Sequence, residues 1–491
     1  MPEIKNTFLK GRMNKDLDER IIPKGEYRDA LNINISTSEE ADVGTVQTIL
    51  GNKKISNLGG GVCVGSISNE KTNKIYWFNI KPNSGINEII EYDQNNNTSS
   101  YIFVDLKANT DEPVLNFPNK IITGINIIND LLFWTDGEGE PKKINIERCK
   151  AGTDQNGADH TKLVVNDINT GVDVKEENIT VIKKKPTKSP VVVTNYTETN
   201  SPYNKKAFLF EKTFSRFAYR YKYEDGEYSA FGPFSEVVFN PQYVKEEDSF
   251  LTNETSYTSK EPFNKSMLNR IDSIDIHNFV CPDTPDDVVE VEILYKQEDS
   301  PVIYSITKIK KDSSDWLNQD YSGSNSFFTG KYTIKTENIY AALPENQFIR
   351  VFDAVPRKAI AQEITGNRLV YANYTQNYNI NEVGGFNEYD VFLSGYYQDR
   401  INNQTSYDSP LKSLKSLKDY QLGVVFGDKY GRETPVFTSA DSSIKIPWKD
   451  DTNDLNASRS LALRASIATN FPTWASYFKF YIKETSTEYY N

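Results

Sequence analysis

Alternating apolar and polar residues predict β-structure along most of the chain, and the clearest example lies at residues 129–150. The segments 131–135 and 143–147 both show the period of two that is typical of a strand. Between them lie four residues that favour turns: Asp136, Gly137, Gly139 and Pro141. We therefore expect two adjacent strands joined by a tight, charged turn.

The same outline occurs at residues 73–79 and 367–373: a polar residue, a spacer, two apolar residues, a large aromatic residue, a spacer, and Asn or Asp. A strand motif repeated with turns in between predicts the blades of a β-propeller. We expect blades at residues 60–105 and 118–167, and a further one near 357–376. The aromatic residues of the motif should pack in the core rather than form a sugar-stacking surface: Trp77, Trp134 and Tyr371.

A second repeated unit follows the basic, proline-containing segment 181–190. The strand–turn–strand pattern of residues 217–239 and the alternating strand 289–296 have counterparts at 420–437 and 477–484. Two such copies predict small immunoglobulin-like (Ig-like) or fibronectin-like sandwiches, although no Trp or Cys hallmark indicates a true immunoglobulin domain. The predicted fold is mainly β, with β-propeller blades interrupted by inserted Ig/fibronectin-like β-sandwich modules.

These patterns divide the chain into five parts. They are an N-terminal docking arm and hairpin (1–58), propeller blades (59–180), an inserted Ig-like β module (181–345), a further propeller blade (346–395) and a second Ig-like β module (396–491). Three blades cannot close a propeller, which normally needs at least four. We therefore expect the polypeptide to continue beyond Asn491, or to be processed there, with the remaining blades in the continuation.

Composition narrows the possible functions. The 56 basic and 68 acidic residues give a net charge of −12, which argues against tightly bound nucleic acid. No apolar run approaches the length of a membrane span, and the first twenty residues lack the apolar middle of a secretory signal. Three cysteines in 491 residues do not form a disulfide framework, which favours synthesis in a reducing cytosol. Cys63 and Cys149 lie in predicted strands, where a small buried thiol is expected.

No residue set predicts a catalytic, cofactor-binding or metal site. The acidic turn of Asp136, Glu138 and Glu140 lacks the ligand spacing of a calcium loop and is expected to be solvated. The same holds for the acidic cluster near the N-terminus: Asp16, Asp18 and Glu19. His160 and His277 are far apart, in surroundings that indicate loops, and no zinc or triad spacing occurs.

Two further features have an ordinary explanation. Carboxylate pairs that could serve glycoside hydrolysis arise by chance in a chain with 68 acidic residues. The lysine-rich segment 183–188 could touch a phosphate backbone, but an isolated basic cluster in an acidic chain favours an exposed linker.

Four long motifs carry a resemblance that covers essentially the whole chain: GRMNKDLDERIIPKGEYRDALNINISTSEEADVGTVQTILGN, RFAYRYKYEDGEYSAFGPFSEVVF, GNRLVYANYTQNY and YQLGVVFGDKYGRETPVF. They resemble the tail muzzle (nozzle-like) structural proteins of crAss-like podoviruses. The resemblance implies a virion protein, assembled in the bacterial cytoplasm, that carries a β-propeller and forms a ring-shaped homo-oligomer, a hexamer. It also implies contacts with hub, ring and fibre proteins of the tail, DNA only in transit, and no catalytic residues.

Two other classes stay open at the level of sequence. A secreted or surface adhesin that binds glycans would also use propellers and Ig-like modules, but should begin with a signal peptide. A tail-associated polysaccharide depolymerase would need a cleft with convergent carboxylates.

Overall fold

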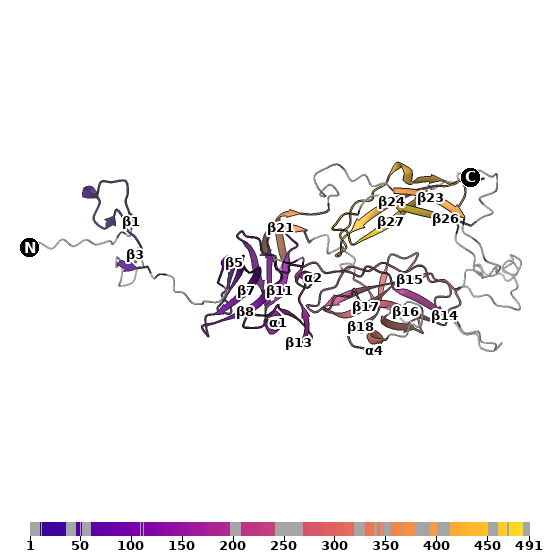
Figure 1. The fold of residues 1–491 in the computed structure, drawn as a ribbon, viewed down its shortest axis with the longest axis horizontal. Helices are drawn as coiled ribbons and strands as arrows, with labels where there is room; N and C mark the ends of the chain where they lie inside the picture. The colour runs from indigo at the N-terminus through magenta and orange to yellow at the C-terminus, as the bar shows by residue number, and fades with distance from the viewer. Residues whose placement is uncertain are drawn as a thin grey trace, which may run out of the picture. The chain divides into compact units, whose positions relative to one another are not determined.

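The computed structural model describes most of the chain. The described residues are 10, 12–35, 46–49, 51, 60–108, 110, 112–196, 208–240, 269–318, 329–337, 341–344, 347, 355–366, 368–378, 393–399, 413–449, 460–468 and 471–484. They form many small antiparallel sheets and a few short helices (Figure 1), which confirms that the protein is mainly β. Contacts divide the chain into two compact units, residues 1–58 and 59–491.

The first unit contains only short elements. Strand β1 (Arg12–Met13) pairs in parallel with β2 (Glu26–Tyr27), and β3 (Ile33–Ile35) pairs with β4 (Val46–Thr48). The 3₁₀ helix η1 (Glu19–Ile21) begins after Asp18, whose side chain accepts a hydrogen bond from the Arg20 amide. Several large apolar side chains of this unit are exposed: Met13, Leu17, Ile21, Leu31 and Ile49.

The second unit begins with a four-stranded antiparallel meander. Its strands are β5 (Val62–Asn69), β6 (Lys74–Lys81), β7 (Ile86–Asp93) and β8 (Thr98–Asp105). A three-stranded sheet follows, made of β9 (Gly124–Ile128), β10 (Leu131–Thr135) and β11 (Lys142–Asn145). Both sheets contribute to one hydrophobic core, in which Phe78 stacks on Phe117 and meets the edge of Trp134.

The predicted strand 143–147 ends early, at Asn145. The Asn145 side chain accepts a hydrogen bond from the Arg148 amide and so caps helix α1 (Ile146–Ala151). The hairpin of β12 (Lys162–Val165) and β13 (Ile168–Asp173) and the short helix α2 (Glu176–Ile179) complete this region. The second predicted blade is therefore a three-stranded sheet, a helix and a separate hairpin.

The third predicted blade is also smaller than expected. Strands β21 (Lys358–Thr365) and β22 (Arg368–Thr375) form a two-stranded hairpin. The Thr135 hydroxyl donates a hydrogen bond to the Ala359 carbonyl, which places β21 against β9 and β10. Among the described residues these sheets do not form a propeller, because only β5–β8 has four strands in sequential order.

Two sheets pack over a shared core in the first inserted region, which we call module A. One sheet has the order β14 (Val191–Asn195), β16 (Ser273–Val280) and β19 (Thr329–Ile334). The other has the order β15 (Ser215–Tyr223), β17 (Val288–Gln297), β18 (Ile303–Lys310) and β20 (Ala341–Ala342), with helix α4 (Ser314–Leu317) after β18. Side chains of both sheets make up the core.

The C-terminal region, which we call module B, has the same two-layer plan. Strand β23 (Leu393–Asp399) pairs with β26 (Leu461–Ile467), and β24 (Asp419–Gly427) lies between β25 (Ser443–Lys445) and β27 (Tyr477–Glu484). The 3₁₀ helix η6 (Ala440–Ser442) precedes β25. Leu393, Val424 and Phe426 form the centre of its core.

Candidate functional site: a charged junction

Charged side chains gather where modules A and B meet residues 59–180. Four segments contribute: the turn before β11 (136–141) with β11 itself, the segment 181–188, the turn after β15 (224–227) and the turn after β24 (428–433). We call this cluster the charged junction. Most of its cations are buried: Lys142, Lys143, Lys183, Lys185 and Arg432.

The turn after β15 binds residues of β11 and α1. The Lys143 ammonium group lies 3.0 Å from Asp225 and also bonds Glu227, and Arg148 lies 2.7 Å from Asp225. Burial by itself raises the pKa of Asp225, but the nearby charges of Lys143 and Arg148 lower it below its usual value of 3.8. Asp225 is therefore a charged carboxylate held between two cations.

The turn after β24 also forms an ion pair with residues 59–180, but here the turn supplies the cation and its partner supplies the carboxylate. The Arg432 guanidinium donates to Glu140 at 2.7 Å and to Asp428 at 2.7 Å. Asp428 also accepts from the hydroxyl of Tyr378 at 2.9 Å and from the backbone amides of its own turn. Both oxygens of Asp428 are thus used, so Arg432 is fixed in position facing Glu140.

The two turns have the same backbone design. The Tyr223 amide bonds the Glu227 carbonyl at 2.8 Å, as the Asp428 amide bonds the Arg432 carbonyl at 3.1 Å. Gly226 and Gly431 occupy equivalent positions with φ of +83° and +102°, which glycine adopts without strain. The repeat predicted from the sequence is therefore also a repeat in structure. The sequence did not indicate that both turns contact residues 136–148.

The prediction that residues 183–188 form an exposed linker is wrong for its first half. Lys183 and Lys185 are only 7% and 6% exposed. Lys183 bonds the Asn178 carbonyl at 2.7 Å and lies 3.5 Å from Asp287, whereas Lys185 lies over the ring of Tyr477 and 3.9 Å from Glu433. Lys188 is exposed, and its partner Asp283 lies 3.9 Å away.

The acidic turn at 136–140 is only partly solvated, in contrast to the sequence prediction. Asp136 is buried and accepts from the amides of Glu138 and Gly139, so it shapes the turn. Glu138 is exposed and pairs with Lys120 at 2.6 Å, and Glu140 pairs with Arg432. Asp16, Asp18 and Glu19 lie on exposed backbone around η1.

Both histidines are buried. His160 lies in the irregular segment between α1 and β12, as the sequence indicated, whereas His277 does not lie in a loop. His277 lies within β16 and is buried, although it follows directly after the core residue Ile276 and so falls outside the alternation of that strand. The Nδ1 atom of His160 accepts from the Leu106 amide at 3.3 Å, and its Nε2 lies 3.0 Å from the Val174 carbonyl. His160 therefore links β8 to the residues before α2.

The three repeated aromatic residues differ in burial. Trp134 is fully buried, as core packing requires, whereas Trp77 and Tyr371 are half-buried. Cys63 is exposed rather than buried, because the pairing of β5 with β6 shifts register beside it. Cys149 lies in α1 instead of a strand, and burial raises the pKa of its thiol to about 12. All three cysteines are free thiols.

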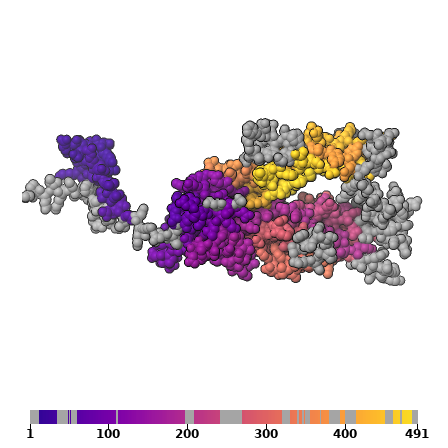
Figure 2. All heavy atoms as spheres, in the orientation of Figure 1, coloured from indigo at the N-terminus to yellow at the C-terminus, as the bar shows by residue number. Residues whose placement is uncertain are grey.

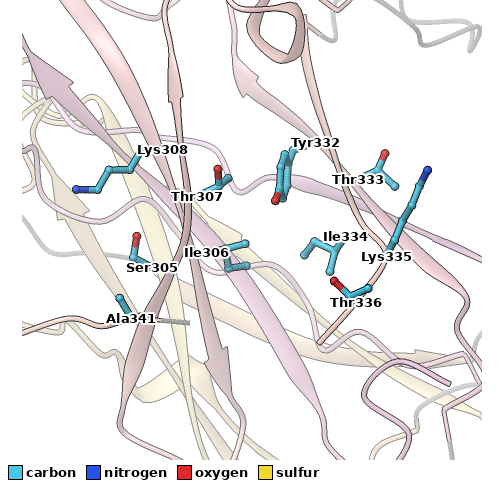
Figure 3. A pocket seen from close by; sticks show the side chains of 10 residues that line it. All are labelled: Ser305, Ile306, Thr307, Lys308, Tyr332, Thr333, Ile334, Lys335, Thr336 and Ala341. Atoms are coloured by element: carbon cyan, nitrogen blue, oxygen red, sulfur yellow. The ribbon is translucent and has the colours of Figure 1, made fainter. Parts of the chain in front are cut away.

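Module A contains a cavity of about 510 Å³ between β18 and β19. Figure 3 shows that its side chains are mostly hydroxyl, lysine and apolar groups from these two strands and the residues after β19. In the part of the chain that the structure describes, no group of three or more His, Cys, Asp or Glu side chains is arranged to hold a metal ion. No described helix is long and apolar enough to cross a membrane.

Comparison of the sequence with protein-family models and with curated proteins finds no match.

Proposed function

We propose that this chain is a structural component of a short bacteriophage tail, a muzzle or nozzle at the distal end. In this role, six copies of the chain form a ring around the channel through which DNA is ejected. The surface of the ring binds other tail proteins, and residues 1–58 reach onto a neighbour. The chain needs no catalytic residue for this function.

The observation that carries the proposal is the charged junction. A channel wall has to keep its modules in a fixed geometry while DNA passes. At the junction, the buried Lys143 pairs with two carboxylates of module A, and the buried Arg432 of module B pairs with Glu140. Buried ion pairs depend strongly on geometry, since separating the partners leaves an uncompensated charge. Such contacts favour one arrangement of the modules, which suits a building element.

Charge supports the same role. The net charge of −12 disfavours binding of DNA phosphates to the protein. An acidic channel wall repels these phosphates and so keeps DNA mobile. The resemblance of the four sequence motifs to podovirus tail muzzle proteins points in the same direction.

The proposal retains the propeller and the Ig-like modules as the finer description of the fold. The sequential order β5–β6–β7–β8 is the order of a propeller blade, and the neighbouring sheet β9–β11 packs over the same core. The two-layer plan of modules A and B supports the comparison with Ig-like or fibronectin-like sandwiches.

Immunogold electron microscopy tests the proposed location. Antibodies raised against the recombinant chain should label purified phage particles at the end of the tail that is remote from the capsid. Labelling of the host cell surface instead would indicate an adhesin. Loss of host capsular glycan on incubation with the purified chain would indicate a depolymerase.

A further inference from the structure

Modules A and B share four strands in the same topology. Strands β14, β15, β16 and β17 of module A correspond to β23, β24, β26 and β27 of module B. In both modules the first and third strands pair, and the second and fourth strands pair, all antiparallel. The shared turn aligns Tyr221 with Phe426, because the backbone amide of each donates a hydrogen bond to the hydroxyl of a residue eight positions later: Ser229 and Thr434.

This alignment fixes the register of the fourth strand. Tyr221 pairs with Val291 in module A, and Phe426 pairs with Phe478 in module B. Val291 therefore corresponds to Phe478, and by counting along the strands Glu292 corresponds to Lys479.

In module A, two further strands cover the outer edges of this shared set. Strand β18 pairs with β17 along its length, and β19 pairs with β16. As a result Val291, Ile293 and Leu294 of β17 are all 0% exposed.

In module B the corresponding edges are uncovered among the described residues. Among the strands that the structure describes, β27 is at the edge of its sheet and β26 pairs only with β23. Phe478, Phe480 and Tyr481, which correspond to the three buried residues of β17, are 45%, 43% and 45% exposed. The strands near the C-terminus, orange to yellow in Figure 2, lie at the visible surface.

An opening into the core accompanies the uncovered edges. A cavity of about 430 Å³ lies between β26 and β27 and reaches Leu422, a buried residue of β24. In module A the corresponding side is occupied by β18 and β19, and its cavity lies one strand further out. An open strand edge beside exposed aromatic residues is a template for pairing with another strand.

We propose that the edge of β27 accepts an antiparallel strand from a partner polypeptide other than this chain, with an apolar–acidic–apolar sequence at its centre. The apolar positions follow from Phe478 and Phe480, which need cover. The acidic position follows from a reversal of charge between the modules.

The charge reversal is visible in the register of β17 and β18. Glu292 bonds Arg220 within its sheet at 2.6 Å and lies opposite Lys308 of β18. The corresponding Lys479 bonds Glu433 of the turn after β24, within module B, so the place opposite Lys479 on the open edge calls for an acidic residue.

Peptides based on β18 test this proposal on the full chain. The probe has the sequence of residues 303–310 with Thr307→Val and Lys308→Glu, so that its centre is apolar–acidic–apolar, and the control carries Thr307→Val alone. A third peptide carries the same Glu but is N-methylated at alternate backbone nitrogens, which blocks strand pairing. Binding is measured by fluorescence anisotropy at peptide concentrations up to about 1 mM, the range of weak but specific complexes.

The Glu peptide should bind about fivefold more tightly than the Lys peptide, as expected for an attractive instead of a repulsive cross-strand pair. The Lys479→Glu variant should reverse this preference, and N-methylation should abolish binding. Equal binding of both peptides, no binding, or unchanged binding after N-methylation would overturn the proposal. Sedimentation that shows self-association blocked by the Glu peptide would identify a second copy of this chain as the occupant, against the proposal.

Discussion

The Lys143→Met substitution tests whether the charged junction holds module A against residues 59–180. Methionine keeps much of the apolar stem of lysine but removes the charge that lies between Asp225 and Glu227. Asp225 would keep only Arg148 as a cation, and Glu227 would lose its partner. The two carboxylates would then repel each other.

The magnitude follows from burial. The Lys143 side chain is 3% exposed and that of Asp225 12%, so water screens this pair weakly. Removing one partner of a buried pair costs about 3–5 kcal/mol, and the remaining Arg148 reduces this to about 2–3 kcal/mol. If that energy opens the junction locally, exchange of the amides it protects should accelerate roughly 30- to 150-fold.

Hydrogen exchange measured by NMR or mass spectrometry is the appropriate assay, because a chain with several modules need not unfold in one step. The amide of Asn166 is a direct reporter, since it donates to Glu224 across the junction at 3.0 Å. The matched control is Lys120→Met, which removes the partner of Glu138 from an exposed pair of similar length. This control should leave the exchange rate of Asn166 nearly unchanged.

The double variant Lys143→Met with Asp225→Asn completes the experiment. If the two residues act through their contact, the second substitution should cost much less in the Lys143→Met background than alone. Strictly additive effects, or an unchanged exchange rate at Asn166 in Lys143→Met, would refute the claim that this contact holds the modules together.

Four other outcomes are expected. Trp134→Ala should lower the free energy of unfolding of residues 59–180 by about 3–5 kcal/mol, measured by urea denaturation, because it leaves a cavity beside Phe78; a change below about 1 kcal/mol would contradict the packing. At neutral pH, iodoacetamide should modify the exposed thiol of Cys63 before that of Cys149, whose pKa is raised to about 12. A Cys63–Cys149 disulfide detected by non-reducing mass spectrometry would contradict a cytosolic origin. Because the pKa of Asp225 is lowered, the stability that its charged form gives the junction is complete above its usual pKa of 3.8 and is lost as pH falls through the folded-state pKa. Hydrogen exchange at the Asn166 amide should report this loss of stability, and the Asp225→Asn substitution should remove this pH dependence. Deleting residues 1–30 should impair incorporation into the tail while leaving the β circular dichroism signal intact, and normal incorporation would argue against a docking arm.

Strand positions were largely predictable from local sequence. The alternation at residues 217–223 and 477–483 places β15 and β27 nearly where the structure has them, because period-two patterns depend only on neighbouring residues. Helix α1 was not predicted, since six residues are too few to show a helical period and its cap is the single residue Asn145.

The charged junction could not be predicted in the same way. Lys185 is buried because Glu433 and Tyr477 lie beside it, and these residues are more than 240 positions away in the sequence. A basic segment in an acidic chain is predicted to be exposed when the residues that pack against it in the fold are unknown. The similarity of the turns 224–227 and 428–433 was visible in the sequence. It indicated that the two turns share a conformation, but not that both contact residues 136–148.

We propose that the chain builds the distal end of a phage tail. A cryo-electron microscopy reconstruction of the assembled particle tests this proposal most directly. We expect a ring of six copies around the channel, with the two-layer density of modules A and B repeated in each copy and joined at the charged junction. A particle map without this chain, or with the chain outside the tail channel, would contradict the account.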